Sequence, residues 1–181
     1  MHLENISFNN LFLIGMMGSW KSTVGQKLAE AIDMEFIDTD DAIEEMTEMK
    51  ITNIFNEYGE KRFREMESAF FIEKAKQEGQ IFSTGGGIVL NKNNRNILRD
   101  NGICFFLDAT PQTLAQRIHN TSKRPLLTDS DNLEERLQYI WNERNQFYKD
   151  CARHTITTDY LNPHQVLKEI LNILEFSIAD H

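Results

Sequence analysis

The chain has 181 residues, of which 40% are hydrophobic and 26% charged, the size and composition of about one folded domain. Its 19 basic and 28 acidic side chains give a net charge of −9, which argues against a nucleic-acid backbone as its main partner. No apolar stretch approaches the ~20 residues of a membrane span, and the first ten residues lack the pattern of a secretory leader. Two cysteines, Cys104 and Cys151, are too few for a disulfide framework and lack metal-ligand spacing, so we expect cytoplasm-like surroundings.

The first half of the chain predicts two strands and a long helical region. A short apolar run predicts a buried strand, and apolar residues that repeat every four positions predict one face of a helix. The expected elements are strands at 11–14 and 36–37 and helices at 23–32 and across most of 41–79, the last with breaks around 50–52 and at Gly59.

The second half continues the same alternation. Residues 103–107 are apolar throughout, as expected of a strand that is covered on both faces. Gly102 is expected to end a helix in the left-handed conformation. The polar segment 120–132 breaks the periodicity and predicts a mobile loop. The expected elements are strands at 81–83, 103–107 and 155–158 and helices at 93–100, from Pro111, at 133–148 and at 163–176.

Strands that alternate with helices predict an α/β fold, a parallel sheet with helices on both faces. Such sheets bind ligands beyond the carboxyl ends of their strands. Four polar or glycine-rich clusters fall there, at 15–22, 38–40, 85–87 and after Leu107. No linker interrupts the chain, so we expect one domain over residues 1–181.

The segment 15–22, Gly-Met-Met-Gly-Ser-Trp-Lys-Ser, follows a predicted strand and opens a predicted helix. It matches the phosphate loop G-x-x-x-x-G-K-[ST] at Gly15, Lys21 and Ser22, but Trp20 stands in place of the second glycine. Backbone N–H groups would hold phosphates, Lys21 would add a point charge, and Ser22 would bind Mg²⁺.

Trp20 endangers this loop, because a bulky residue in a conformation that favours glycine costs ~1–3 kcal/mol. Three outcomes stay open: a strained but working loop, a reshaped loop with weak nucleotide affinity, or an inactive loop. The alternative to a phosphate loop is an ordinary strand-to-helix turn with a solvated lysine.

Asp38 and Asp40 lie two residues apart at the end of a predicted strand. In an extended chain both side chains point the same way. Two carboxylates facing a phosphate site suit water-mediated Mg²⁺ binding and acceptance of a proton from an alcohol. The alternative is that they cap a helix that begins near Asp41.

Arg64 lies between Glu60 and Glu67 at helical spacing. The three side chains either pair along an exposed helix or form a guanidinium fork, held by carboxylates, that is aimed at a substrate carboxylate. Phe55 and Phe63 then wall a pocket, or they simply pack in the core.

The remaining clusters also leave two interpretations open. Consecutive glycines at 85–87 cost backbone entropy, which indicates either close approach of a ligand to the backbone or a flexible turn. Arg117, Lys123 and Arg124 either close over a polyphosphate or form a solvated basic loop. Arg144 is either a second anion-binding arginine or an exposed helix charge.

Taken in this order, the pieces resemble shikimate kinase over about residues 10–174. The resemblance implies a nucleoside-monophosphate-kinase-like fold, a three-layer P-loop kinase with five parallel strands, a substrate-binding helical region at about 41–79 and a lid at about 120–132. It rests on the phosphate-loop remnant, Asp38-Thr-Asp40, Phe63-Arg64-x-x-Glu67, Gly85–Gly87, Arg124-Pro-Leu-Leu127 and Glu143-Arg144-x-x-x-Tyr148.

The resemblance also implies an activity, transfer of the ATP γ-phosphate to the 3-hydroxyl of shikimate with Mg²⁺. The implied catalytic residues are Lys21, Asp40 as the base, and Arg124 from the lid. Ser22 binds the metal directly and Asp38 through water. The family's usual arginine before the Asn-Pro pair is Leu161 here. The implied nucleotide site is Gly15, Met16, Met17, Gly18, Ser19, Trp20, Lys21, Ser22, Thr23, Arg117, Arg124, Asn162 and Pro163, and the implied shikimate site is Asp40, Phe55, Phe63, Arg64, Gly85, Gly86, Gly87 and Arg144.

Two alternatives to a working shikimate kinase remain. One is a catalytically silent member of the family, because Trp20 replaces the loop glycine. The other is a related small-molecule kinase, such as a gluconate-type enzyme, which Asp40, Arg64 and Arg144 disfavour. We expect a cytoplasmic monomer whose partner is a small molecule, with neither nucleic acid nor membrane.

Overall fold

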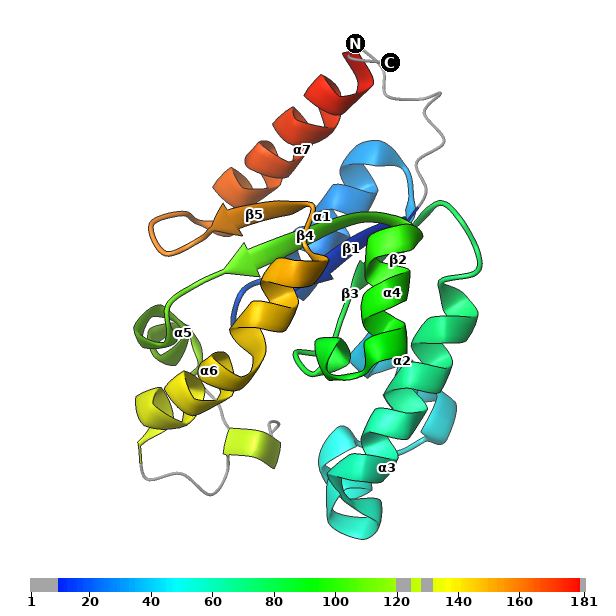
Figure 1. Ribbon diagram of the computed structural model, residues 1–181, viewed down its shortest axis with the longest axis vertical. Coiled ribbons are helices and arrows are strands. Elements are labelled where there is room, and N and C mark those ends of the chain that lie inside the picture. Colours follow the sequence, from blue (N-terminus) through cyan, green and yellow to red (C-terminus); the bar gives the residue numbers. More distant parts are fainter. Residues whose placement is uncertain (1–9, 120–124, 128–131, 180–181) are drawn as a thin grey trace.

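The computed structural model describes residues 10–119, 125–127 and 132–179 (Figure 1). Its centre is a five-stranded parallel sheet in the order β2-β3-β1-β4-β5. All five predicted strands are confirmed, and β1, which precedes the phosphate loop, lies in the middle and is buried along its whole length. The strands are β1 Asn10–Ile14, β2 Glu35–Asp38, β3 Gln80–Ser83, β4 Gly102–Asp108 and β5 His154–Thr157.

Helices cover both faces of the sheet, as the alternation in the sequence predicts. Within the described residues the helices are α1 Lys21–Ile32, α2 Thr39–Thr47, α3 Ile51–Lys74, α4 Lys92–Asp100, α5 Pro111–Arg117, α6 Leu133–Cys151 and α7 Pro163–Ala179, with 3-10 turns at Ile88–Leu90 and Pro125–Leu127.

The pleat of the strands sorts their side chains into two cores. Phe12 and Phe106 pack with α3, α4 and α6 on one face, whereas Leu11 and Phe105 pack with α1 and α7 on the other. Figure 1 shows the same three layers, with α2, α3, α5 and α6 gathered below the sheet. The sheet is therefore buried on both faces.

The region predicted as one interrupted helix consists of two. Helix α2 ends at Thr47, and Glu48 takes a left-handed conformation with a φ of 52°. The predicted break at 50–52 is therefore slightly misplaced, because α3 already begins at Ile51. The break predicted at Gly59 is confirmed, since its φ of 80° and ψ of 166° kink α3.

The prediction that Gly102 ends a helix in the left-handed conformation is wrong. The residue follows the end of α4, but it opens β4 and has no left-handed conformation. A Cβ atom there would lie closer than 3.0 Å to the carbonyl oxygen of Asn10, its partner on β1. Glycine is needed because two backbones approach closely.

We therefore expect Gly102→Ala to destabilise the protein. The clash is with backbone, so the strands would have to shift, at a cost of about 1–3 kcal/mol. Urea unfolding measures this, with Asn101→Ala, an exposed neighbour, as the control, expected within about 0.5 kcal/mol of wild type. An alanine variant as stable as wild type would contradict the packing described here.

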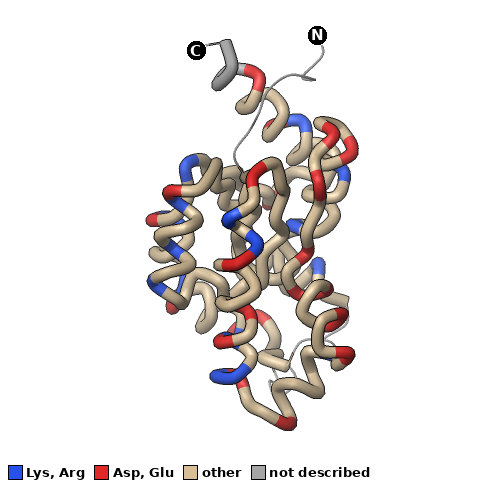
Figure 2. The backbone as a smooth tube through the Cα atoms, turned by 90° about the vertical axis from the view of Figure 1, so that its right-hand side faces the viewer, with Lys and Arg blue, Asp and Glu red and all other residues tan. Residues whose placement is uncertain are grey.

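None of the helices in the described part of the chain combines the length and apolar character needed to cross a membrane. Figure 2 shows acidic and basic positions interspersed over the face in view. Neither sign of charge therefore covers this face alone.

Candidate active site

The loop between β1 and α1 has the geometry of a phosphate loop. Gly15 has a φ of 141° and packs against the carbonyl oxygen of Leu107, where a Cβ atom would not fit. Gly18 has a φ of 83°. Helix α1 begins at Lys21, so its first backbone N–H groups face the end of the sheet and favour an anion.

Trp20 stands where the phosphate-loop motif has glycine, and its backbone has the conformation that favours glycine. Its φ of 69° and ψ of 18° are left-handed, which costs a residue with a Cβ atom ~1–3 kcal/mol. Of the three outcomes set out above, this backbone corresponds to a strained loop.

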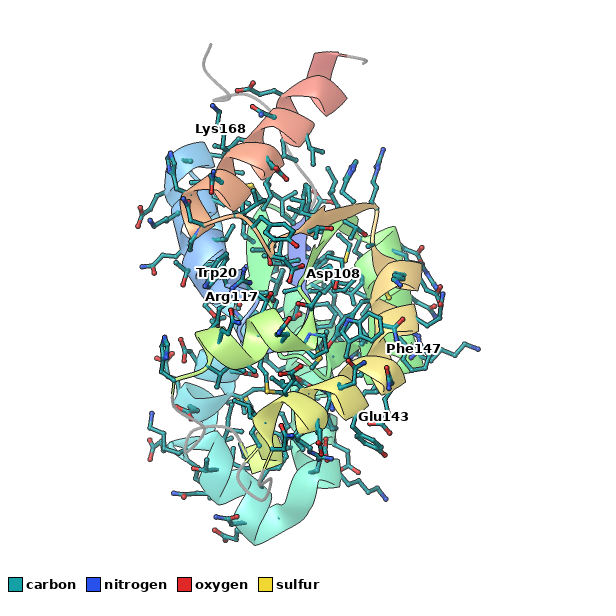
Figure 3. The ribbon with its side chains drawn as sticks, turned by 90° about the vertical axis from the view of Figure 1, so that its left-hand side faces the viewer. Trp20, Asp108, Arg117, Glu143, Phe147 and Lys168 are labelled. Carbon is teal, nitrogen blue, oxygen red and sulfur yellow. The ribbon has the colours of Figure 1, made fainter. Side chains whose placement is uncertain are left out.

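Arg117 lies against the Trp20 indole. Its Cζ atom is 3.5 Å from the ring centroid, and Figure 3 shows the two labelled side chains together beside α5. The guanidinium also donates to the carbonyl and hydroxyl oxygens of Thr158, at 2.6 and 3.0 Å. Burial lowers the pKa of Arg117, against the opposing effect of Asp159. Arg117 ends α5, just before the segment predicted as a lid, and it is tied to the residue that follows β5.

Lys21 is buried within the loop. Its ammonium donates to the carbonyl oxygens of Gly15 and Met16, at 2.9 and 2.8 Å. The hydroxyl oxygen of Ser19, a fully buried residue, lies 3.5 Å from the same nitrogen. A positive charge is thus held at the loop, where a polyphosphate would bind the backbone N–H groups.

The side-chain oxygen atoms of Ser22 and Asp38 lie next to each other. The Ser22 hydroxyl donates to Oδ2 of Asp38 at 2.6 Å and lies 3.2 Å from the hydroxyl of Ser83. Oδ1 of Asp38 accepts from the backbone of Asp40 and Asp41, so it caps α2. The capping alternative is correct for Asp38 alone, because the helix begins at Thr39 rather than near Asp41, and this cap leaves Oδ2 directed at Ser22.

Asp40 does not lie on an extended strand beside Asp38, as the sequence analysis assumed. Helix α2 begins at Thr39, which places Asp40 in its first turn. Its Oδ1 atom is shielded from solvent and has no hydrogen-bond partner among the described residues. Burial, followed by the charges of Glu67 and Asp38, raises the pKa of Asp40 from 3.8 to about 7. A carboxylate with this pKa can exchange a proton near neutral pH.

Arg64 pairs with both neighbouring carboxylates along α3. Its Nη1 atom donates to Glu67 at 2.7 Å, and Nε and Nη2 both lie 3.3 Å from one oxygen of Glu60. Burial acts to lower the pKa of Arg64, but Glu67 and Glu60 outweigh it and raise that pKa. Burial also raises the pKa of Glu67 in spite of Arg64. The fork is therefore fixed and charged before any ligand binds.

Arg144 is buried, with 4% of its surface exposed, so its interpretation as an exposed helix charge is wrong. Its Nη1 atom donates to the Gly86 carbonyl at 3.2 Å, and Nε has no partner among the described residues. The hydroxyl of Tyr148, one turn later on α6, donates to the same carbonyl. Burial raises the pKa of Tyr148 to about 12.

Gly85 and Gly87 are required by side chains of the site itself, whereas a Cβ atom at Gly86 would meet its neighbours at ordinary contact distance. A Cβ atom at Gly85 would lie closer than 3.0 Å to the carboxylates of Glu67 and Asp40, and one at Gly87 would collide with the Arg64 guanidinium. The close approach to the backbone at Gly85 and Gly87 therefore comes from protein side chains, which neither interpretation of this segment includes. Nothing in the local sequence signals this.

Two other residues hold this turn and were not predicted as site residues. The Thr39 hydroxyl accepts from the backbone N–H of Gly85 at 2.9 Å, and Tyr148 binds Gly86 as described. The sequence does carry a signal for the burial of Tyr148. Every fourth residue of one face of α6 is buried, namely Ile140, Arg144 and Tyr148.

Two neighbouring cavities meet at this edge of the sheet. The larger, of about 600 Å³, is lined by Asp38 and Asp40, by Arg64 and Arg144, and by the ring pair of Phe55 and Phe63, whose centroids are 4.9 Å apart. The smaller, of about 290 Å³, is lined by residues of the phosphate loop and by Arg117. Both are lined by Met17, Ser22, Asp38, Asp40 and Gly86.

Most predicted site residues come together here, and a few do not. Thr23 lines the smaller cavity, and the side chain of Met16 packs in the core with Tyr148. Asn162 caps α7 by accepting from two backbone N–H groups at 3.0 Å, and Pro163 opens that helix; neither lines the two cavities. Lys123, Arg124 and most of the predicted lid at 120–132 lie outside the described residues.

Comparison with known proteins identifies the family. The family model for shikimate kinase matches residues 17–175. The chain belongs to the shikimate kinase family. A shikimate kinase from Haemophilus influenzae (strain PittEE) is 40% identical over 166 residues, 92% of each chain. One from Caldicellulosiruptor bescii is 40% identical over 164 residues, covering 91% of this chain and 94% of its own.

Solved structures agree with this family and fold. A shikimate kinase from Acinetobacter baumannii in complex with shikimate has a TM-score of 0.91 and 32% identity, covering 97% of this chain and 96% of its own. A deoxyadenosine kinase from M. mycoides, at 16% identity, has a TM-score of 0.62 and shares the fold. The gluconate-type alternative is wrong, because the family shown is that of shikimate kinase.

Asp40 makes a pH-dependent contribution to stability. Its folded pKa of about 7 exceeds its unfolded value, so the folded state binds the proton more tightly and stability falls as pH rises from about 4 to 7. We expect Asp40→Asn, which cannot ionise, to exceed wild type in unfolding free energy at about pH 8 and to lose this advantage near pH 4. Urea unfolding across this range measures the difference.

The control for this experiment is Glu45→Gln, which removes an exposed carboxylate from the same helix. Its difference from wild type should stay within about 0.5 kcal/mol at every pH. A difference between Asp40→Asn and wild type that does not change with pH would contradict the raised pKa.

Proposed function

We propose that the chain transfers the γ-phosphate of ATP to the 3-hydroxyl of shikimate, with Mg²⁺. The observation that carries the proposal is the junction of the two cavities at Asp40. One cavity has the arginines to hold a carboxylic acid, and the other has a phosphate loop. The relative from A. baumannii was solved with shikimate bound, which supports the choice of acceptor.

The larger cavity suits a small hydroxylated acid. Arg64 and Arg144 offer guanidinium groups to the carboxylate, and charge-assisted bonds of this kind contribute about 1.5–3 kcal/mol each. Phe55 and Phe63 cover the apolar part of the ring. Because Glu60 and Glu67 already hold Arg64, little reorganisation is needed when the acid binds.

The smaller cavity suits the polyphosphate of the donor. The backbone N–H groups that open α1 and the ammonium of Lys21 would neutralise the charge of the transferring phosphoryl group. A loose phosphoryl-transfer transition state asks for little beyond this positioning and neutralisation.

The oxygen atoms of Ser22 and Asp38 fit Mg²⁺. Magnesium prefers hard oxygen ligands and is held in kinases by one or two side chains, water and phosphate oxygens. The Ser22 hydroxyl and Oδ2 of Asp38 lie 2.6 Å apart at the junction of the cavities. When bound there, the metal would neutralise charge on the phosphate oxygens.

Asp40 is the proposed base. Asp40 lines both cavities, so a hydroxyl directed from the larger cavity to the smaller would reach its carboxylate. With a pKa of about 7 the carboxylate is available to accept the hydroxyl proton at neutral pH and above.

We extend the proposal to a cytoplasmic monomer. ATP, the proposed donor, is available in the cytoplasm. Arg124, Asn162 and Pro163 stay in the proposal as further nucleotide contacts, on the strength of the family resemblance.

The test is shikimate-dependent ADP release, with the phosphorylated position assigned by NMR. We expect activity to rise with pH through about 7, since the base must lose its proton. Asp40→Asn should lower kcat by about 10²–10⁴-fold, and Glu45→Gln should leave it unchanged. Folded wild-type protein without shikimate-dependent ADP release would refute the proposal and leave the silent alternative.

The role of Arg64 is tested with Arg64→Lys, which keeps a charge beside Glu67 but loses the planar fork. We expect the KM for shikimate to rise about tenfold or more, with a smaller change in kcat and in the KM for ATP. Arg62→Lys, an exposed position paired with Glu65 on the same helix, is the control and should change nothing. An unchanged KM in the folded Arg64 variant would remove this residue from the acceptor site.

A further inference from the structure

Trp20 keeps a backbone conformation that favours glycine, and a neighbouring side chain stacks on it. The Arg117 guanidinium carbon is 3.5 Å from the centroid of the indole, and both residues line the smaller cavity. We propose that Arg117 is a positioning residue for the phosphate loop, holding the Trp20 indole so that residue 20 stays in the left-handed conformation. The consequence for ATP rests on the function proposed above.

Arg117 is itself firmly held. Its two Nη atoms donate to the carbonyl and hydroxyl oxygens of Thr158, at 2.6 and 3.0 Å. Thr158 is fully buried, and its backbone N–H and hydroxyl both donate to the carbonyl of Asp108, at 2.7 and 3.0 Å. The guanidinium is therefore anchored to the ends of β4 and β5, which are paired strands of the sheet.

The stack acts on the loop through the indole. A guanidinium over the face of a tryptophan ring is attracted by the ring quadrupole, and its planar shape suits stacking. The indole also packs against the core that lies between α1, α7 and the sheet. Rotation of residue 20 out of the left-handed region would separate the indole from both surfaces.

The conformation of residue 20 sets the start of α1. The Trp20 carbonyl accepts from the N–H of Val24 at 2.8 Å, the first backbone hydrogen bond of that helix. The N–H groups of Lys21 and Ser22 follow directly, and these are the donors that a phosphate loop offers. Loss of the left-handed conformation would turn these donors away from the smaller cavity.

Arg117 has one competing role, which is direct contact with the nucleotide, as the family resemblance implies. The two roles differ in their dependence on residue 20. A contact with the base or with phosphate charge acts whatever stands at position 20, whereas support of the indole matters only while the indole is there. A glycine at position 20 needs no support.

The experiment is a double-mutant cycle of wild type, Trp20→Gly, Arg117→Gln and the double variant. The probe is inorganic tripolyphosphate with Mg²⁺, which lacks a base, titrated by calorimetry. We expect Arg117→Gln to weaken binding about tenfold when Trp20 is present and less than twofold when glycine replaces it. Thermal unfolding confirms that each variant is folded and gives a second measure of coupling.

Two further variants separate stacking from charge and size. Arg117→Lys keeps the charge but not the planar stack, so it should bind tripolyphosphate like Arg117→Gln rather than like wild type. Trp20→Ala keeps the conformational cost and loses the stack, so it should bind more weakly than both wild type and Trp20→Gly. In the Trp20 chain, Arg117→Gln should raise the KM for ATP more than it lowers kcat.

Equal weakening by Arg117→Gln in both backgrounds, or full rescue by Arg117→Lys, would overturn the inference, because either result assigns Arg117 to the ligand alone. If wild type releases ADP with shikimate but the effects of Trp20→Gly and Arg117→Gln are independent, the inference is overturned and the proposed function stands. Coupling in a chain that does not phosphorylate shikimate supports the inference and refutes the proposed function. Wild-type protein that binds no tripolyphosphate overturns both.

Discussion

The site depends on the absence of side chains at Gly85 and Gly87. The carboxylates of Asp40 and Glu67 and the guanidinium of Arg64 occupy the space in which Cβ atoms would stand. A turn without side chains thus lets groups from α2 and α3 converge on the end of β3, while Tyr148 holds the same turn from α6. Asp40 and Arg64 can therefore pack against this turn while they line the larger cavity.

Charge is balanced locally, although the chain carries −9 overall. Burial, and after it the charges of Glu67 and Asp38, raises the pKa of Asp40, and the cations Lys21 and Arg64 limit the effect. Glu67 in turn keeps Arg64 charged in a half-buried position. The cations that would meet an anionic acid or a polyphosphate are therefore fixed by acidic side chains and backbone carbonyls, which explains how an acidic protein offers sites for anions.

The sequence predicts the layers of the fold well, because apolar runs and helical periodicity are local signals. It also predicts the phosphate loop and the left-handed backbone at Trp20, since motif and conformation share one short segment. It misses what depends on packing between distant segments: the start of α2 at Thr39, the burial of Arg144, and the contact between Trp20 and Arg117. Those features depend on contacts between residues that are distant in the sequence, so no motif within one short segment predicts them.

The tryptophan in the phosphate loop also gives the protein an intrinsic optical reporter. The chain contains two tryptophans, and Trp20 lines the smaller cavity, whereas Trp141 packs against the core on the opposite face of the sheet. Indole emission responds to polarity and to nearby charge, so a ligand that enters this cavity would change the fluorescence of Trp20 directly. The residue that strains the loop thereby makes its occupancy observable without a label.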